Sequence, residues 1–168
     1  TQPEGECEIE VTGVNFGGPY LPSELYNYDP ERFKYYGEPY AYDSIMRIIY
    51  MEVQTSEPTP DMFVSAFPKM DYDFAGHDII FFDLLIGSCE PFEYTTIITE
   101  NMPYYICAAA FDYKGDVTPM WMSEPIDWRD VEPRPIEELI EKIDASEANI
   151  QMLGIGANGK VVPISPVR

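Results

Sequence analysis

Short apolar segments alternate with turn-forming residues from residue 45 to residue 126, and no other feature of the chain constrains its fold as strongly. The segments have the length of a β-strand and are rich in Ile, Val, Thr, Tyr and Phe, which strands favour. Pro, Gly, Asp and Asn mark the turns between them. Short strands with turn signals at this spacing predict an antiparallel all-β sandwich. The expected strands are 45–54, 62–67, 79–86, 94–98, 104–111 and 117–126.

Two of these segments, 79–86 and 104–111, are apolar on both faces. Side chains alternate across a strand, yet here both alternating sets are apolar, with Asp83 as the exception. A sheet with one solvated face would carry polar residues there. We therefore expect another part of the chain to cover this outer face, and the small Cys107 and Ala109 leave room for a helix. The expected core residues are Ile80, Phe82, Leu84, Ile98, Tyr104, Ile106 and Ala108.

The N-terminal region, residues 1–44, opens with alternating polar and apolar residues at 6–11, which predict a half-buried strand. A turn is expected at 17–19, where the sequence is Gly-Gly-Pro. From 20 to 42 the chain is rich in tyrosine but keeps no helical or strand period, which indicates an irregular segment.

The tyrosines of this segment are candidate ligand-binding residues. Tyrosine rings stack on sugar faces and make contacts of low entropic cost at protein interfaces. The alternative is that the rings pack on the outer face of the sheet, because an irregular segment needs apolar anchors to be ordered. The candidates are Tyr35, Tyr36, Tyr40 and Tyr42.

Residues 128–168 form a tail with a different pattern. Pro135 can open a helix, and over residues 135–144 apolar side chains recur at i, i+3, i+4 and i+7. We expect this amphipathic helix to dock on the outer face of the sheet, with the tyrosine-rich segment as the competing location. Further on, Asn158-Gly159 between apolar runs predicts a terminal β-hairpin. The apolar stripe of the helix consists of Ile136, Leu139, Ile140 and Ile143.

The chain carries 30 acidic and 10 basic residues, which gives a net charge of −20. A surface this acidic repels phosphate groups, so we expect no nucleic-acid partner and no direct binding to an anionic membrane. No apolar run approaches the roughly 20 residues that a membrane-spanning helix needs. We interpret the negative charge as one that keeps the protein soluble. The alternative is a specific function of the charge, in an acidic inhibitor or a nucleic-acid mimic.

Motifs for catalysis are weak. The single histidine, His77, lies in an expected turn, and no Gly-x-Ser-x-Gly elbow accompanies it. Cys7, Cys89 and Cys107 lack metal-binding or redox spacing, and a Cys89–Cys107 bridge is the alternative to free thiols. Residues 112–116 supply too few ligands for a calcium loop and are interpreted as a turn. We expect no catalytic residue, metal or cofactor, while a carboxylate pair in a carbohydrate-active protein stays open as an alternative.

A set of motifs in residues 94–119 carries a family resemblance. They are Tyr94-x-Thr96-x-Ile98, Pro103-Tyr104-x-Ile106-x-Ala108-x-Ala110-x-Asp112, and then Gly115, Thr118 and Pro119. Together they resemble strands E and F of a fibronectin type III domain and its turn into strand G. By extension, residues 45–54, 62–67 and 79–86 resemble strands A, B and C. The resemblance implies an immunoglobulin-like sandwich over 45–127 with a role in display or adhesion, and it implies no catalytic residues.

The expected fold class is therefore mainly β: a fibronectin III-like sandwich (45–127), preceded by the tyrosine-rich extension (1–44) and followed by the helix and hairpin (128–168). The chain is also similar in style to bacterial surface lipoproteins that carry such domains. That similarity implies an extracellular or cell-surface location and a protein or glycan ligand there. The chain starts at Thr1 rather than Met, so we expect that a signal peptide has been removed.

Overall fold

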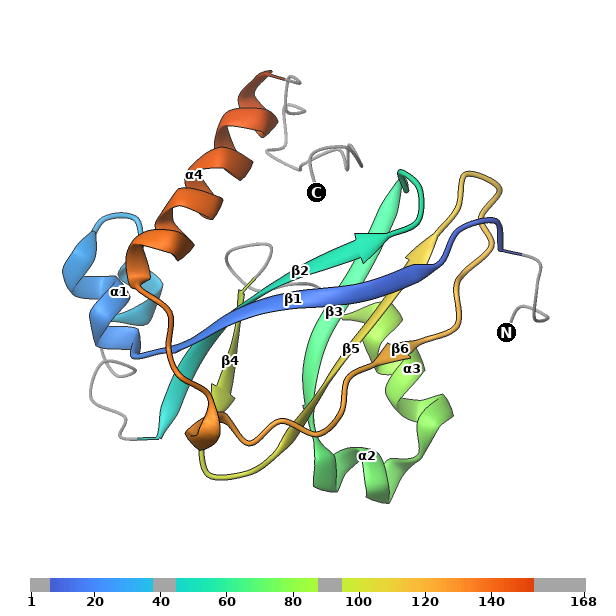
Figure 1. Cartoon of the computed structure of the whole chain (residues 1–168), viewed down its shortest axis with the longest axis horizontal. Helices are drawn as coiled ribbons and strands as arrows, with labels where there is room; N and C mark the ends of the chain where they lie inside the picture. The colour runs from blue at the N-terminus through green and yellow to red at the C-terminus, as the bar shows by residue number, and fades with distance from the viewer. Residues whose placement is uncertain (1–6, 38–44, 88–94, 153–168) are drawn as a thin grey trace.

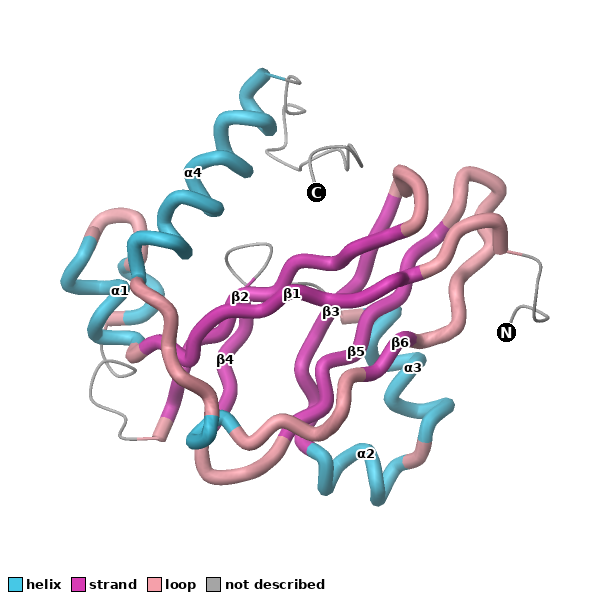
Figure 2. The backbone as a smooth tube through the Cα atoms, in the orientation of Figure 1, coloured by secondary structure: helices cyan, strands magenta, loops and turns pink. Residues whose placement is uncertain are grey.

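The computed structural model of the chain describes residues 7–37, 45–87 and 95–152. Over these residues the strands form two three-stranded antiparallel sheets, shown in Figures 1 and 2. The first sheet has the order β1 (Val11–Tyr20), β2 (Met46–Thr55), β4 (Thr95–Thr99). The second sheet has the order β3 (Asp61–Pro68), β5 (Tyr104–Phe111), β6 (Trp121–Met122).

The two sheets enclose the main core of the molecule. Alternate residues of β2, Ile49 and Met51, share one buried cluster with Ile106 and Ala108 of β5. The predicted core positions Ile98, Tyr104, Ile106 and Ala108 are all buried in this cluster, which confirms them. Tyr105 packs instead with residues on the opposite face of β5. The predicted strand 104–111 and its facing are therefore confirmed.

The outer face of the first sheet is covered by helices from both ends of the chain (Figure 1). Helix α1 (Pro22–Tyr28) and the 3-10 helix η1 (Lys34–Tyr36) come from the tyrosine-rich segment, and α4 (Ile136–Met152) comes from the tail. The predicted stripe of α4 packs there against Ile48 and Tyr50 of β2. The expected helix is confirmed, and it continues beyond residue 144. It lies beside the tyrosine-rich segment, which was the competing location, and not on the outer face of the sheet that holds residues 104–111.

Polar contacts hold α4 in this position. Arg32 and Asp144 form an ion pair, with 2.7 Å between Nη1 of Arg32 and Oδ1 of Asp144. Lys142 pairs with Glu52 of β2 at 3.2 Å, and its ammonium lies 5.7 Å from the ring centre of Tyr50. The tail therefore contacts both the first sheet and the segment that follows β1.

The outer face of the second sheet is covered by α2 (Lys69–Ala75) and α3 (His77–Ile86). Residues 79–86 were expected as a strand and lie in a helix instead, so this prediction is wrong. A run of about eight apolar residues has the length of a strand but cannot be distinguished by period from a buried helical segment. Within α3, Ile80 and Leu84 are one turn apart and pack on Cys107 and Ala109 of β5. Those two small residues do admit a helix, but it is α3 and not the C-terminal one.

The architecture is therefore mixed, with two sheets between layers of helices, rather than mainly β. Several boundaries also differ from expectation. Strand β1 starts at Val11 and continues through the expected turn at 17–19, and the turn expected between the strands 62–67 and 79–86 is largely helix α2. Of 117–126, only Trp121–Met122 is a strand, flanked by isolated bridges at Val117 and Ile126. The hairpin expected at Asn158-Gly159 lies outside the described residues.

Candidate binding surface

The candidate tyrosines are divided between the core and the surface. Tyr36 is 0% exposed and belongs to the cluster beneath α4, whereas Tyr35 beside it is 44% exposed. Their rings meet edge to face with centroids 5.4 Å apart. Tyr36 packs on the outer face of a sheet, as in the alternative interpretation, but this is the first sheet and not the sheet that holds residues 104–111. Tyr40 and Tyr42 lie outside the described residues, so a platform of all four rings stays a prediction.

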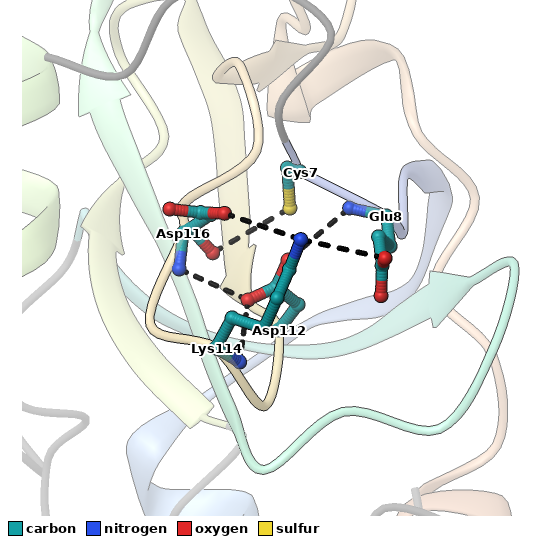
Figure 3. A network of polar contacts seen from close by, with 5 residues as sticks. All are labelled: Cys7, Glu8, Asp112, Lys114 and Asp116. Carbon is teal, nitrogen blue, oxygen red and sulfur yellow. Dashed lines mark hydrogen bonds and ion pairs between the residues drawn. The ribbon is translucent and has the colours of Figure 1, made fainter.

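A polar network joins the N-terminal segment to the connection after β5 (Figure 3). The carboxylate of the buried Asp112 accepts hydrogen bonds from the backbone N–H groups of Lys114 and Asp116, both at 2.9 Å, and of Glu8 at 3.2 Å. Burial by itself raises the pKa of Asp112, but these three donors and the Lys114 charge outweigh it and lower the pKa below its usual value. The Cys7 thiol lies 3.5 Å from the Asp116 carbonyl oxygen.

This network is a structural clamp. The turn closes at Gly115, whose φ of +91° suits glycine, and Lys114 pairs with Glu8 at 3.4 Å across it. Three backbone donors occupy the Asp112 carboxylate, which leaves it poorly placed to bind a cation. Among the described residues, no group of three or more His, Cys, Asp or Glu side chains is arranged to hold a metal ion.

The potential catalytic groups have structural roles as well. His77 begins α3, and its Nδ1 lies 2.9 Å from the hydroxyl of Tyr72, so the pair links α2 to α3. Cys107 is a free thiol, and burial raises its pKa to about 12. A thiol with that pKa stays protonated near neutral pH, which makes it a poor nucleophile.

The α2–α3 pair presents a large apolar surface to solvent. One side of each helix packs on the second sheet, through residues such as Tyr72, Ile80 and Leu84. The other side is exposed: Phe74 is 94% exposed and Phe82 is 62% exposed. We define the α2–α3 surface by its five exposed apolar side chains, each more than half exposed: Met70, Phe74, Ile79, Phe82 and Ile86.

On each of the two helices, the spacing of the exposed apolar residues places them on the same side. Met70 and Phe74 are four residues apart on α2, and Ile79, Phe82 and Ile86 follow at i, i+3 and i+7 on α3. The two helices are separated by Gly76, whose φ of +93° ends one helix and begins the next. Helix α3 is therefore apolar on nearly all sides, a pattern normally found in helices that are wholly buried.

The α2–α3 surface is bordered by acids. Asp71, Asp73, Asp78 and Asp83 are all exposed on the same two helices. Lys69 is the only Lys or Arg of these helices, and it pairs with Asp73 at 2.6 Å. The surface thus combines exposed apolar side chains with an excess of negative charge.

The α2–α3 surface is not predicted from the sequence, because residues 79–86 are expected there as a strand. The spacing of Ile80 and Leu84 does not distinguish a strand from a helix, because residues four apart share a face in a strand as well as in a helix. One available signal was Asp78, an acid in the first turn after a glycine, which is typical of a helix start.

Comparison of the chain with protein-family models, with curated proteins and with solved structures finds no match. In the part of the chain that the structure describes, no helix is both long and apolar enough to cross a membrane. The α2–α3 surface is therefore assigned from the geometry of the chain alone.

Proposed function

We propose that the chain is a non-enzymatic binding or display module, built on a fibronectin III-like sandwich, which binds a protein partner through the α2–α3 surface. Its expected setting, from the similarity in style to bacterial surface lipoproteins, is the cell exterior. The α2–α3 surface carries the proposal, and the strand arrangement supports the family resemblance.

The order of the strands supports the sandwich part of the proposal. In immunoglobulin-type sandwiches the first, second and fifth strands share one sheet, and the third, sixth and seventh form the other. Here β1, β2 and β4 form one sheet and β3, β5 and β6 the other, with α2 and α3 between β3 and β4. Under this proposal β2 and β3 correspond to strands B and C, one letter later than the sequence resemblance placed them.

Tyr104 adds a second observation. It stands at the start of β5, and its hydroxyl accepts a hydrogen bond from the backbone N–H of Thr99, five residues earlier, at 2.9 Å. Such a bond across the connection between the two sheets is the feature called a tyrosine corner in immunoglobulin-type sandwiches.

The exposed apolar side chains of the α2–α3 surface support the binding part. Phe74 and Phe82 alone present on the order of 300 Å² of apolar area, given the usual size of an aromatic side chain. Covering that area would contribute about 7 kcal/mol at 25 cal/mol/Å², before the costs of association. Exposed apolar patches of about a few hundred Å² are often functional, and a polar border such as the one here is typical of interaction sites.

Selection of peptides tests this proposal. Peptides from a random displayed library are selected on the immobilised chain, then measured against Phe74→Ser/Phe82→Ser and against a control, Leu21→Ser/Tyr28→Ser, that removes two exposed apolar side chains elsewhere. We expect the first variant alone to lose binding. Peptides that bind both variants as well as the unmodified chain would contradict the assigned surface.

The carbohydrate alternative retains one observation, the exposed ring of Tyr35 in the tyrosine-rich segment. A glycan array probed with the unmodified chain and with Tyr35→Ala distinguishes the carbohydrate alternative from the proposed binding of a protein. Glycan binding that Tyr35→Ala abolishes and Phe74→Ser/Phe82→Ser leaves intact would favour the alternative.

A further inference from the structure

We infer that the partner of the α2–α3 surface is a cationic amphipathic helix: one apolar face bordered by Lys or Arg. This inference depends on the proposed binding function, and it specifies the chemistry of the partner.

The stripe on α3 has the form that a helix partner recognises. Ile79, Phe82 and Ile86 project on one side over a helix of 10 residues, which spans about 15 Å. Amphipathic helices bind such surfaces through anchors at i, i+3, i+4 and i+7. A partner helix of about two to three turns would match the length of the stripe, and residues at its ends would carry the flanking charges.

The charge at the stripe determines which helix is favoured. Asp78 and Asp83 lie on α3 itself and Asp71 on α2, all exposed, and no ion pair engages them among the described residues. Lys69 is already paired with Asp73. Complementary potentials favour a partner with cationic flanks, and an acidic partner would place like charges together.

The same charges argue against the other occupants. A two-fold dimer through this surface would bring Asp78 and Asp83 close to the same residues of the second copy. Each copy also carries a net charge of −20, so the two copies repel at long range. An anionic membrane surface is disfavoured for the same electrostatic reason.

The probes are three synthetic peptides of about 14 residues, roughly four helical turns. All three carry Leu at i, i+3, i+4 and i+7, and the remaining positions are Lys, Gln or Glu. A scrambled Lys peptide, which has the same charge but no apolar face, controls for attraction to the acidic chain as a whole. Binding is measured by fluorescence anisotropy at low and at moderate salt.

Two acid variants separate local charge from total charge. Asp78→Asn/Asp83→Asn removes two carboxylates at the stripe, and Glu132→Gln/Glu141→Gln removes two exposed carboxylates elsewhere, so both have the same net charge. We expect the unmodified chain to bind the Lys peptide most tightly, the Gln peptide less tightly and the Glu peptide least tightly. We expect the first variant to weaken the Lys peptide by about 3- to 10-fold and the second to have little effect. The Gln peptide should bind all three proteins alike.

The outcomes are distinct. Equal affinity for the three peptides, lost in Phe74→Ser/Phe82→Ser, would overturn the cationic partner and leave the proposed binding function intact. If none of the three peptides binds in a way that depends on Phe74 and Phe82, the helical cationic partner is overturned, and the library selection decides separately whether the α2–α3 surface binds any partner. Equal effects of the two acid variants, or strong binding of the scrambled peptide, would show that total charge acts rather than the stripe. Dimerisation of the unmodified chain that Phe74→Ser/Phe82→Ser abolishes, measured by sedimentation, would identify a second copy as the occupant instead.

Discussion

The hydroxyl of Tyr104 accepts a hydrogen bond from the backbone N–H of Thr99 at 2.9 Å, and the Thr99 hydroxyl lies 3.2 Å away. Thr99 ends β4 in the first sheet, and Tyr104 begins β5 in the second. The bond therefore spans the point at which the chain crosses between the sheets. Tyr104 is buried and Thr99 is half-buried, so the bond is partly shielded from water.

Replacing Tyr104 by Phe should lower the free energy of unfolding by about 1–2 kcal/mol. The ring and its packing are kept, but the Thr99 N–H loses its acceptor. The measurement is chemical denaturation monitored by fluorescence. Tyr105→Phe is the matched control, because Tyr105 makes no hydroxyl hydrogen bond among the described residues and packs on the other face of β5. Equal losses for the two variants would contradict a specific role for the Tyr104 hydroxyl.

Leu139→Ala should lower the free energy of unfolding by about 2–4 kcal/mol, because a fully buried side chain in the cluster under α4 is removed. The exposed Glu141→Ala, on the same helix, tests for an effect of helix propensity alone and should stay within about 0.5 kcal/mol. A loss below about 0.5 kcal/mol for Leu139→Ala would mean that α4 does not depend on this contact, and its stripe would become a second candidate binding surface.

Elements with a clear local pattern can be predicted from the sequence. Strand 104–111 and the start of α4 were predicted well because their periods are clear and Pro135 marks the helix start. Helix α3 was mistaken for a strand because its apolar residues continue on both sides, so neither period is visible. Only the contact with Cys107 and Ala109, which lie more than 20 residues later in the sequence, shows which side of the helix is buried.

Trp128 is an example of a residue that no local pattern marks. It lies in a 3-10 helix of the tail, yet it is almost completely buried with the residues between the sheets, and its ring meets Phe16 of β1 edge to face. Its indole N–H has no hydrogen-bond partner among the described residues. The burial of a tail residue between the two sheets depends on the path of the whole chain, which composition and spacing do not report.

Acid should weaken the clamp around Asp112. The pKa of Asp112 is lower in the folded chain than in the unfolded chain, so its ionised form stabilises the fold above the unfolded pKa. That contribution is lost as the pH falls from about 5 through the lowered pKa. Asp112→Asn should therefore melt at a lower temperature than the unmodified chain at neutral pH, and the gap should narrow as the pH falls.

The comparison with Asp112→Asn isolates this effect from the other charges. Protonating the many exposed acids relieves repulsion in both proteins, so their difference in melting temperature reports on Asp112. The neighbouring Lys114, Glu8 and Asp116 are present in both. A gap that stays constant from neutral to strongly acidic pH would contradict the role of the ionised carboxylate.

Phe82 and Leu84 provide the sharpest test of helix α3. In a strand these two residues would face the same side, but in α3 Leu84 is buried against the second sheet and Phe82 is exposed. Leu84→Ala should lower the free energy of unfolding by about 2–4 kcal/mol, and Phe82→Ala by less than about 0.5 kcal/mol. Both variants remove a large apolar side chain from the same element, so each controls for the other in chemical denaturation. Large losses for both variants would contradict the helix, and with it the exposed α2–α3 surface on which the binding proposal depends.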